Sequence, residues 1–169
     1  MKLNLGAGYI RKPGYKNVDI RWQTKPDFLI DLEKPHCLKR FKKNSIDEIF
    51  TSSFLEHVKN YEGLMSEIYR VCKPNARVII NVPHVGNQSS FCDPTHVRYF
   101  TENSMAYLDK ATIGSDQQPI TVPYDFKIEA VDFQVFDEYK GMSVKKVFEN
   151  SRKYWNVIKK ITFVLRVNK

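Results

Sequence analysis

Five short apolar runs in the first half of the chain constrain its fold most strongly. They are LNLGAG (3–8), NVDI (17–20), DFLIDL (27–32), IDEIFTSS (46–53) and ARVIINVP (76–83), each rich in Ile, Val, Leu or Phe. Runs of this length and composition predict buried strands. Before the fifth run, the segment 54–73 repeats apolar residues at spacings of three and four and ends at Lys73-Pro74-Asn75, which predicts an amphipathic helix. Strands joined by crossovers predict an α/β fold with a doubly wound, mostly parallel sheet.

The second half of the chain predicts two more strands, KIEAVDFQVF (127–136) and KKITFVLRV (159–167). A short helix is expected from Asn103 or Ser104, followed by a loop over 114–125. A longer helix is expected over 143–160, because Ser143 is a suitable N-cap and one helical face collects large apolar residues. That face holds Val144, Val147, Phe148, Trp155 and Ile158. We expect Trp155 and Phe148 to belong to the core and not to a stacking platform.

Length and composition bound the class of protein. With 169 residues, we expect one domain over 1–169, with a substrate or lid region over about 84–125. A bilayer span would need about 18 or more consecutive apolar residues, and no such run occurs. The start MKLNLGAG does not read as a secretory signal, so we expect a soluble, cytoplasmic protein. Cys37, Cys72 and Cys92 are odd in number and form no CxxC, so we expect free, mostly buried thiols.

The positive charge lies at one end of the chain. Residues 140–169 hold nine Lys and Arg against the single acid Glu149, and the whole chain carries a formal charge of +8. Such a basic end attracts nucleic acid, an anionic glycan or an acidic membrane surface, and it is equally compatible with a solvated face.

The glycine turn after the first run raises the question of its ligand. Gly6 and Gly8 are present, but position 11, where a dinucleotide-binding GxGxxG has its third glycine, is arginine. Asp19 also comes sooner than the acidic residue of that fingerprint, and the crossover between Gly8 and Val18 is too short for a long helix. A ligand with an adenosine but no pyrophosphate fits better, with one carboxylate for the ribose and a second for the adenine amine. Asp19 and Asp31 stand at those two places.

Five motifs in order carry a family resemblance over about residues 2–100. LNLGAG, NVDI, DFLIDLEKP, IDEIFTSSFLEHV and YRVCKPNARVIINVPH together resemble the class I S-adenosylmethionine-dependent methyltransferases, and within them the small type 11 methyltransferase-domain group. The resemblance implies S-adenosyl-L-methionine as cofactor and a Rossmann-like seven-stranded sheet that ends in an antiparallel C-terminal hairpin. The N-terminal helix of many relatives is absent from the sequence as it stands, so we expect either a more open cofactor site or cover from the loop after residue 83 or from a partner chain.

The resemblance also assigns cofactor-binding residues. The glycine turn, with Leu5, Gly6, Ala7 and Gly8, would line the methionine and the ribose. Asp19 would bind the ribose, and Asp31 with Leu32 would contact the adenine. Ser52, Ser53 and Phe54, at the end of the fourth strand, would face the methyl-bearing sulfur.

Catalytic residues are expected on the loops after the fourth and fifth strands. Methyl transfer to a hydroxyl needs an aligned acceptor and a base for its proton. Candidates for the base and its partners are His57, Asp93 and His96, with His84, Arg98 and Tyr99 as substrate-binding residues. The alternatives are a turn capped by Asp93, packing of Tyr99 on the sheet, and a His57 that only ends a helix. Magnesium at His84, Asp93 and His96 is disfavoured because magnesium prefers oxygen ligands, and we expect no metal.

The sequence lacks one motif that would indicate a nucleic-acid base as the methyl acceptor. The segment after the fourth strand is TSSF, whereas amino-methylating enzymes acting on nucleic-acid bases carry (D/N)PP(Y/F) there, so base methylation is disfavoured. We expect O-methylation of a saccharide or another small hydroxyl-bearing metabolite, with nucleic acid a less favoured partner. The alternative is a non-catalytic module that binds cofactor or a partner and docks on RNA through its basic end. A nicotinamide-dependent oxidoreductase is opposed by the missing third glycine.

Overall fold

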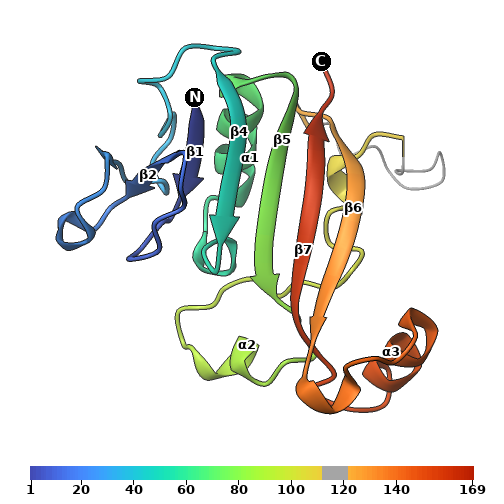
Figure 1. Ribbon diagram of the computed structural model, residues 1–169. Coiled ribbons are helices and arrows are strands. Elements are labelled where there is room, and N and C mark those ends of the chain that lie inside the picture. Colours follow the sequence, from blue (N-terminus) through green and yellow to red (C-terminus); the bar gives the residue numbers. More distant parts are fainter. Residues whose placement is uncertain (112–121) are drawn as a thin grey trace.

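The computed structural model describes residues 1–111 and 122–169, which contain a seven-stranded sheet in the order β3-β2-β1-β4-β5-β7-β6 (Figure 1). The first five strands in sequence are parallel, and β7 is antiparallel to both of its neighbours. The predicted fold class is therefore confirmed, although most of the predicted loop at 114–125 lies outside the described residues. The strands are β1 Lys2–Leu5, β2 Tyr15–Asp19, β3 Phe28–Leu29, β4 Ile46–Ser52, β5 Cys72–Pro83, β6 Phe126–Val135 and β7 Ile158–Val167.

Helices occupy two places relative to the sheet. Figure 1 shows α1 behind β4 and β5, whereas α2 and α3 lie beyond the end at which β4 and β5 finish. The helices are α1 Tyr61–Val71, α2 Ser89–Cys92 and α3 Val144–Ser151, with 3-10 turns η1 Trp22–Thr24, η2 Leu55–His57, η3 Ala106–Leu108 and η4 Asp137–Tyr139. None of the described helices has the length and apolar character that a membrane crossing requires.

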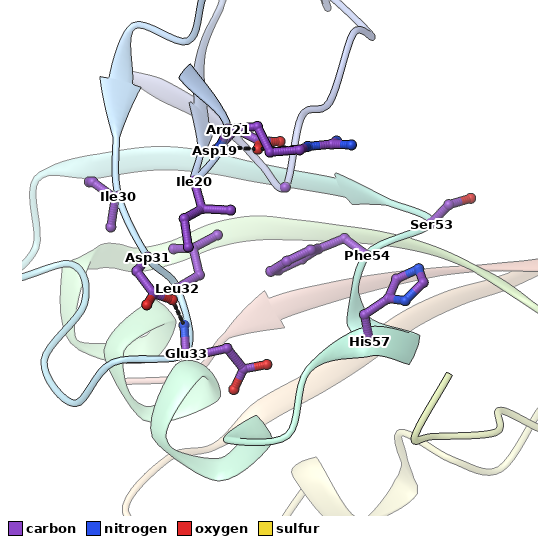
Figure 2. Close-up of a pocket in the computed structure, with 11 residues that line it drawn as sticks. Asp19, Ile20, Arg21, Ile30, Asp31, Leu32, Glu33, Ser53, Phe54 and His57 are labelled. Carbon is purple, nitrogen blue, oxygen red and sulfur yellow. Dashed lines mark hydrogen bonds and ion pairs between the residues drawn. The ribbon is translucent and has the colours of Figure 1, made fainter. Parts of the chain in front are cut away.

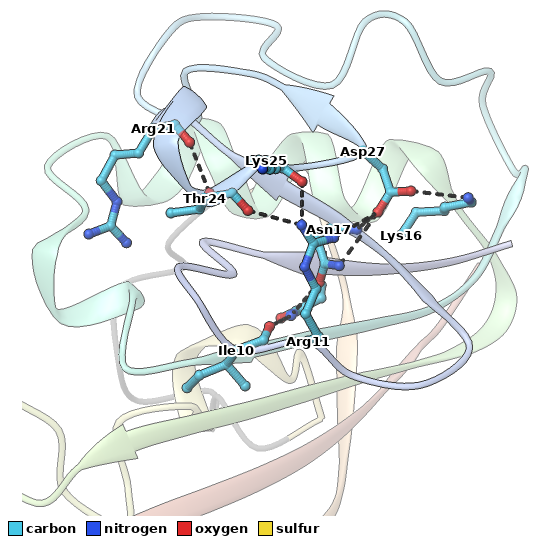
Figure 3. Close-up of polar contacts among 9 residues, drawn as sticks. Ile10, Arg11, Lys16, Asn17, Arg21, Thr24, Lys25 and Asp27 are labelled. Atoms are coloured by element: carbon cyan, nitrogen blue, oxygen red, sulfur yellow. Dashed lines mark hydrogen bonds and ion pairs between the residues drawn. The ribbon is translucent and has the colours of Figure 1, made fainter.

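The first crossover is indeed too short for a helix, and side chains hold it in place (Figure 3). Arg11 Nη2 donates to the carbonyl of Thr24 at 2.9 Å and to that of Lys25. Asn4 Nδ2 donates to the carbonyl of Ile10 at 3.0 Å and to Asn17 Oδ1 at 2.9 Å. The arginine that departs from the dinucleotide fingerprint thus ties the turn to the next connection.

The two faces of the sheet differ because of these short crossovers. On the face packed by α1, neighbouring strands contribute fully buried side chains such as Leu3, Ile49 and Val78. On the other face, Lys2 pairs with Glu48 at 3.1 Å and Arg77 with Glu129 at 3.5 Å. Parallel sheets are usually buried on both faces. Here cross-strand ion pairs replace the apolar side chains that crossover helices would otherwise cover.

Three predicted helices are wrong in their extent. The helix expected over 54–73 begins only at Tyr61, because η2 forms first, and it ends before the proline since β5 starts at Cys72. The helix expected from Asn103 or Ser104 is reduced to η3.

The predicted helix over 143–160 stops at Ser151, although Ser143 is its N-cap and accepts the amide of Lys146 at 3.4 Å, as expected. Trp155 therefore lies outside the helix and is 62% exposed, which contradicts its expected place in the core.

Among the free cysteines, Cys72 is buried, Cys37 is half-buried and Cys92 is exposed.

An ion pair between a buried glutamate and a half-buried arginine fixes the loop before β4 to α1. The Glu67 carboxylate accepts the amide of Leu38 at 3.0 Å and the Arg70 Nε at 2.6 Å. Arg70 also donates to the carbonyls of Leu38 and Phe41, at 3.0 and 3.1 Å. The Arg70 side chain is the main cause that lowers the pKa of Glu67, with the Leu38 amide acting in the same direction and burial opposing both.

Acid should therefore remove the stabilisation that Glu67 provides. Its folded-state pKa lies below that of an unfolded glutamate, about 4.3, so its contribution is present above that pH and is lost as the pH falls. We expect Glu67→Gln to lower the free energy of unfolding by about 1–3 kcal/mol at pH 7. In urea titrations, the difference between wild type and variant should close as the pH falls below about 4. A difference that is constant with pH would contradict this account.

Candidate functional site

A cleft of about 310 Å³ opens at the carboxyl ends of β1, β2 and β4 (Figure 2). Ligands of open α/β sheets bind at this edge, beside the point where the strand order reverses. The cleft is lined by Gly6, Asp19, Ile20, Arg21, Ile30, Asp31, Leu32, Glu33, Ser53, Phe54 and His57.

The glycine turn forms one wall of the cleft and has no room for a side chain at Gly6. Gly6 has a φ of +61°, and a Cβ built there would lie 2.7 Å from the Cβ of Phe54 and closer still to its ring. Only glycine fits this backbone under the phenyl ring. The Phe54 side chain therefore covers Gly6 on the side where a Cβ would stand, and the two residues together form this wall of the cleft.

Asp19 holds the turn from the end of β2. Its Oδ2 accepts the amide of Gly8 at 2.7 Å, and its Oδ1 accepts the Arg21 amide at 2.8 Å and the Arg21 Nε at 3.3 Å. The side chain is only 5% exposed. Burial alone would raise the pKa of Asp19, but these hydrogen bonds together lower it. The carboxylate is therefore ionised and fixed at the wall of the cleft.

The wall that faces the turn is held by two acidic residues. Asp31 Oδ1 accepts the amide of Glu33 at 3.0 Å. The Glu33 carboxylate accepts the amides of Lys59 and Asn60, at 2.8 and 2.9 Å, and so ties this loop to the start of α1. Figure 2 shows Ile20 and Ile30 near Asp31 at this side of the cleft. This side of the cleft therefore offers two apolar side chains beside a carboxylate.

His57 stands at the opposite rim and belongs to a relay of side chains. Its Nδ1 lies 2.8 Å from Thr95 Oγ1, which donates to Asp93 Oδ1 at 2.6 Å. The Thr95 hydroxyl is the main cause that lowers the pKa of Asp93, so this carboxylate is ionised. The predicted catalytic residues His57, Asp93 and His96 are thus brought together, since the His96 ring meets the His57 ring edge-on at 4.6 Å.

Two comparisons with known proteins bear on this geometry. Residues 19–80 match the family model described as a methyltransferase domain. Among solved structures, a SAM-dependent methyltransferase from Archaeoglobus fulgidus superposes with a TM-score of 0.65 at 16% identity, over 98% of this chain and 85% of that one. The chain has the class I methyltransferase fold. No curated protein matches the sequence.

Two further solved structures also superpose on the chain. A putative methyltransferase from Bacillus halodurans C-125 has a TM-score of 0.64 at 13% identity, over 99% of this chain and 92% of that one. A structure of the Haloferax volcanii Trm112 methyltransferase activator in complex with the putative methyltransferase gives a TM-score of 0.63 at 11% identity, over 99% and 82%. The fold that the resemblance implied is therefore confirmed, and residues 19–80 match a model of the methyltransferase domain that it named.

Most residues predicted to contact a cofactor line the cleft of this methyltransferase fold, and four do not. Gly6, Asp19, Asp31, Leu32, Ser53 and Phe54 are among its walls. Leu5 and Ala7 are buried, Gly8 supports Asp19, and Ser52 Oγ lies 3.4 Å from Asn81 Oδ1.

The predicted substrate-binding residues lie apart from the cleft. Burial lowers the pKa of His84, against the opposing effect of Glu102, and its Nδ1 accepts the amide of Gly86 at 3.0 Å. Arg98 donates to the carbonyls of Val58 and Lys59, at 2.9 and 3.1 Å.

Tyr99 belongs to an exposed aromatic cluster that sequence reasoning missed. Its ring stacks on Phe91 at 4.6 Å, and Phe91 meets the exposed Trp155 at 5.6 Å. Trp155 also lines a second hollow of about 310 Å³ together with Arg152 and Lys153. Exposed aromatic clusters of this kind mark binding surfaces. The helical spacing of apolar residues over 143–160 concealed it, because that pattern assigned Trp155 to a buried helix face.

Glu56 was also missed. Its side chain is buried, and its Oε2 has no hydrogen-bond partner within the described residues. Its carbonyl accepts the amides of Val97 and Arg98, at 2.8 and 3.1 Å, which ends η2 and brings the segment with His96 to His57. No local pattern in the sequence announces this pairing.

Proposed function

We propose that this protein binds S-adenosylmethionine in the cleft and transfers its methyl group to a hydroxyl of a saccharide or similar small metabolite. The observation that carries the proposal is the buried Asp19, whose pKa is lowered and which holds the glycine turn at the wall of the cleft. When bound, S-adenosylmethionine supplies an electrophilic methyl group on a sulfonium.

The walls of the cleft suit the parts of this cofactor. A carboxylate has about four lone-pair sites, and Asp19 uses three of them within the protein, which leaves one directed at a ribose hydroxyl. Ile20 and Ile30 would enclose the adenine, and Asp31 would accept from its amine. Gly6 would take the methionine portion. Each part of the cofactor then has a partner of matching chemistry.

The acceptor would enter at the His57 rim. Because the cofactor methyl must face the acceptor oxygen in line, the reacting hydroxyl belongs beside Ser53, Phe54 and His57. The cluster of His57, His96 and Glu56 lies at this rim and would hold the hydroxyl and promote loss of its proton. Lys160 Nζ donates to Ser53 Oγ at 3.1 Å and adds positive charge there.

The surface beyond the rim favours an anionic ring. Phe91, Tyr99 and Trp155 offer exposed aromatic faces, on which the apolar face of a sugar can pack. Arg152 and Lys153 line the adjoining hollow and would pair with a phosphate or carboxylate. An acceptor such as a uronate or a sugar phosphate meets both requirements.

The acceptor class can be tested with labelled S-adenosylmethionine and three sugars: glucose, glucuronate and glucose 6-phosphate. We expect Arg152→Ala with Lys153→Ala to raise KM for the two anionic sugars by roughly 2- to 30-fold, as expected for two exposed ion pairs. Lys145→Ala with Lys146→Ala, on the exposed side of α3, removes the same charge away from the hollow and serves as control. An equal effect of both double variants on all sugars would contradict the assignment.

One neighbour raises a second candidate, a methyltransferase that needs a partner. The Haloferax structure holds a methyltransferase together with its activator. The sheet face opposite α1, which here carries cross-strand ion pairs, is the area where such a partner would find room. Cofactor binding by the purified chain alone separates the two candidates, because a partner-dependent enzyme would bind the cofactor weakly without its activator.

A further inference from the structure

We propose that Glu56, His57 and His96 form a binding site for one divalent transition-metal ion at the rim of the cleft. One potential ligand atom from each residue lies within 4.8 Å of the other two. Glu56 is 1% exposed, and its Oε2 has no hydrogen-bond partner in the described part of the chain. A buried carboxylate oxygen without a partner is costly, and a bound cation would satisfy it.

The hydrogen bonds of the two imidazoles leave the same nitrogen free on each. His96 Nδ1 lies 2.8 Å from the carbonyl of Ser90, which only accepts, so this nitrogen carries the proton. The Thr95 hydroxyl gives its one proton to Asp93, so His57 Nδ1 must donate to Thr95 Oγ1. In this tautomer of both rings, Nε2 keeps an unshared lone pair, which is the form in which histidine binds a metal through Nε2.

These outer hydrogen bonds are the kind that support metal ligands. A histidine that binds a metal commonly donates the N–H of its other ring nitrogen to a backbone carbonyl, or towards a carboxylate as part of a relay. This hydrogen bond fixes the tautomer and the orientation of the ring. His96 has the carbonyl of Ser90, and His57 has Thr95 backed by Asp93. The backbone pairing of Glu56 with Val97 and Arg98 holds the two halves of the cluster together.

The ligand set indicates the class of metal. Two imidazoles and one carboxylate suit zinc or ferrous iron, whereas magnesium prefers oxygen ligands. Binding at about 2.0–2.2 Å requires the three side chains to close by a small rotation. Three protein ligands leave a coordination position open, as in catalytic zinc sites. The sequence predicted no metal, and its candidate set of His84, Asp93 and His96 lacked the buried Glu56.

The role of the ion rests on the proposed function. His57 lines the cleft, so an ion on its Nε2 would meet the acceptor hydroxyl there. The ion would lower the pKa of that hydroxyl, whose proton leaves to water. The hydroxyl oxygen would then form a bond to the methyl carbon while the bond between sulfur and that carbon breaks. The electron pair of the broken bond would stay on sulfur. His57 acts in this case as a ligand and not as the base.

Titration of the metal-free full chain with zinc chloride in a calorimeter, without S-adenosylmethionine, tests the site. We expect one ion per chain and a rise of the melting temperature on binding. The side-chain amide of asparagine can donate the hydrogen bond that histidine Nδ1 donates, but it has no atom in place of Nε2. His57→Asn and His96→Asn should therefore fold. Because loss of an outer-shell partner already costs about 10- to 100-fold, each of these variants should lose at least about tenfold in zinc affinity. Glu56→Gln should lose a similar factor.

The matched control is His36→Asn, at an exposed histidine whose φ of +53° asparagine tolerates. Its zinc affinity should equal that of wild type. Wild type that binds no zinc at about 100 μM, or cluster variants that bind it as wild type does, would overturn the site. Failure of the proposed function would be seen separately, as absence of S-adenosylmethionine binding. The two measurements are distinct because His96 and Glu56 are not among the residues that line the cleft.

Discussion

Gly6→Ala should abolish cofactor binding and destabilise the protein. The new Cβ would lie 2.7 Å from the Cβ of Phe54 and nearer to its ring, and the φ of +61° is unfavourable for alanine. The left-handed backbone costs about 1–2 kcal/mol and overpacking about 1–3 kcal/mol, so we expect the free energy of unfolding to fall by about 2–5 kcal/mol. Displacement of Phe54 also reshapes the cleft. Urea titration and calorimetry with S-adenosylmethionine measure the two effects.

Gly14→Ala is the matched control for this substitution. Gly14 also has a positive φ, +80°, but a Cβ there meets nothing within 4 Å. The variant should lose about 1–2 kcal/mol of stability and keep its cofactor affinity. If Gly6→Ala lost no more stability and cofactor affinity than Gly14→Ala, the packing of Phe54 on the glycine turn would not determine the shape of the cleft.

Asp19→Ala should have the second largest effect. It leaves the buried amide of Gly8 without its acceptor and removes the partner of Arg21, which should cost about 1–3 kcal/mol of stability. It also removes the carboxylate proposed to bind the ribose, which should weaken S-adenosylmethionine binding by about 1–3 kcal/mol, or roughly 5- to 150-fold. Calorimetry at a temperature where the variant is folded measures the affinity.

Asp27→Ala separates the two effects of the Asp19 substitution. Asp27 likewise accepts a backbone amide, that of Asn17 at 2.8 Å, and is ion-paired with Lys16 at 3.0 Å, but it lies outside the cleft. It should lose stability and keep its affinity for the cofactor. Unchanged affinity in Asp19→Ala would place the ribose elsewhere.

The strands were predictable because their signal is local. Runs such as IDEIFTSS and ARVIINVP are short, branched and apolar, and each became a strand within a few residues of the expected bounds. The seven-stranded sheet and its antiparallel C-terminal hairpin were implied by the family resemblance and not by these runs, and the order of the strands was not predicted. Glycine and aspartate at the first two strand ends located the cleft, since both follow strands whose carboxyl ends meet at one edge.

Helix ends were missed where distant segments intervene. Residues 54–60 have helical periodicity, yet the carbonyl of Glu56 bonds to Val97 and Arg98. The helix expected to reach 160 ends early, and Asn156 adopts a φ of +59° and bonds to Gly86. Tertiary hydrogen bonds overrode propensity in both places. The same long-range pairing buries Glu56, so its part in the histidine cluster was invisible in the sequence.

Calorimetric titration of the purified wild-type chain with S-adenosylmethionine, and with S-adenosylhomocysteine, measures directly whether the cleft binds the cofactor. We expect one site per chain with micromolar affinity, retained in Gly14→Ala and lost in Gly6→Ala. Absence of binding to the folded wild-type chain at millimolar ligand would contradict the claim that this cleft alone holds the cofactor.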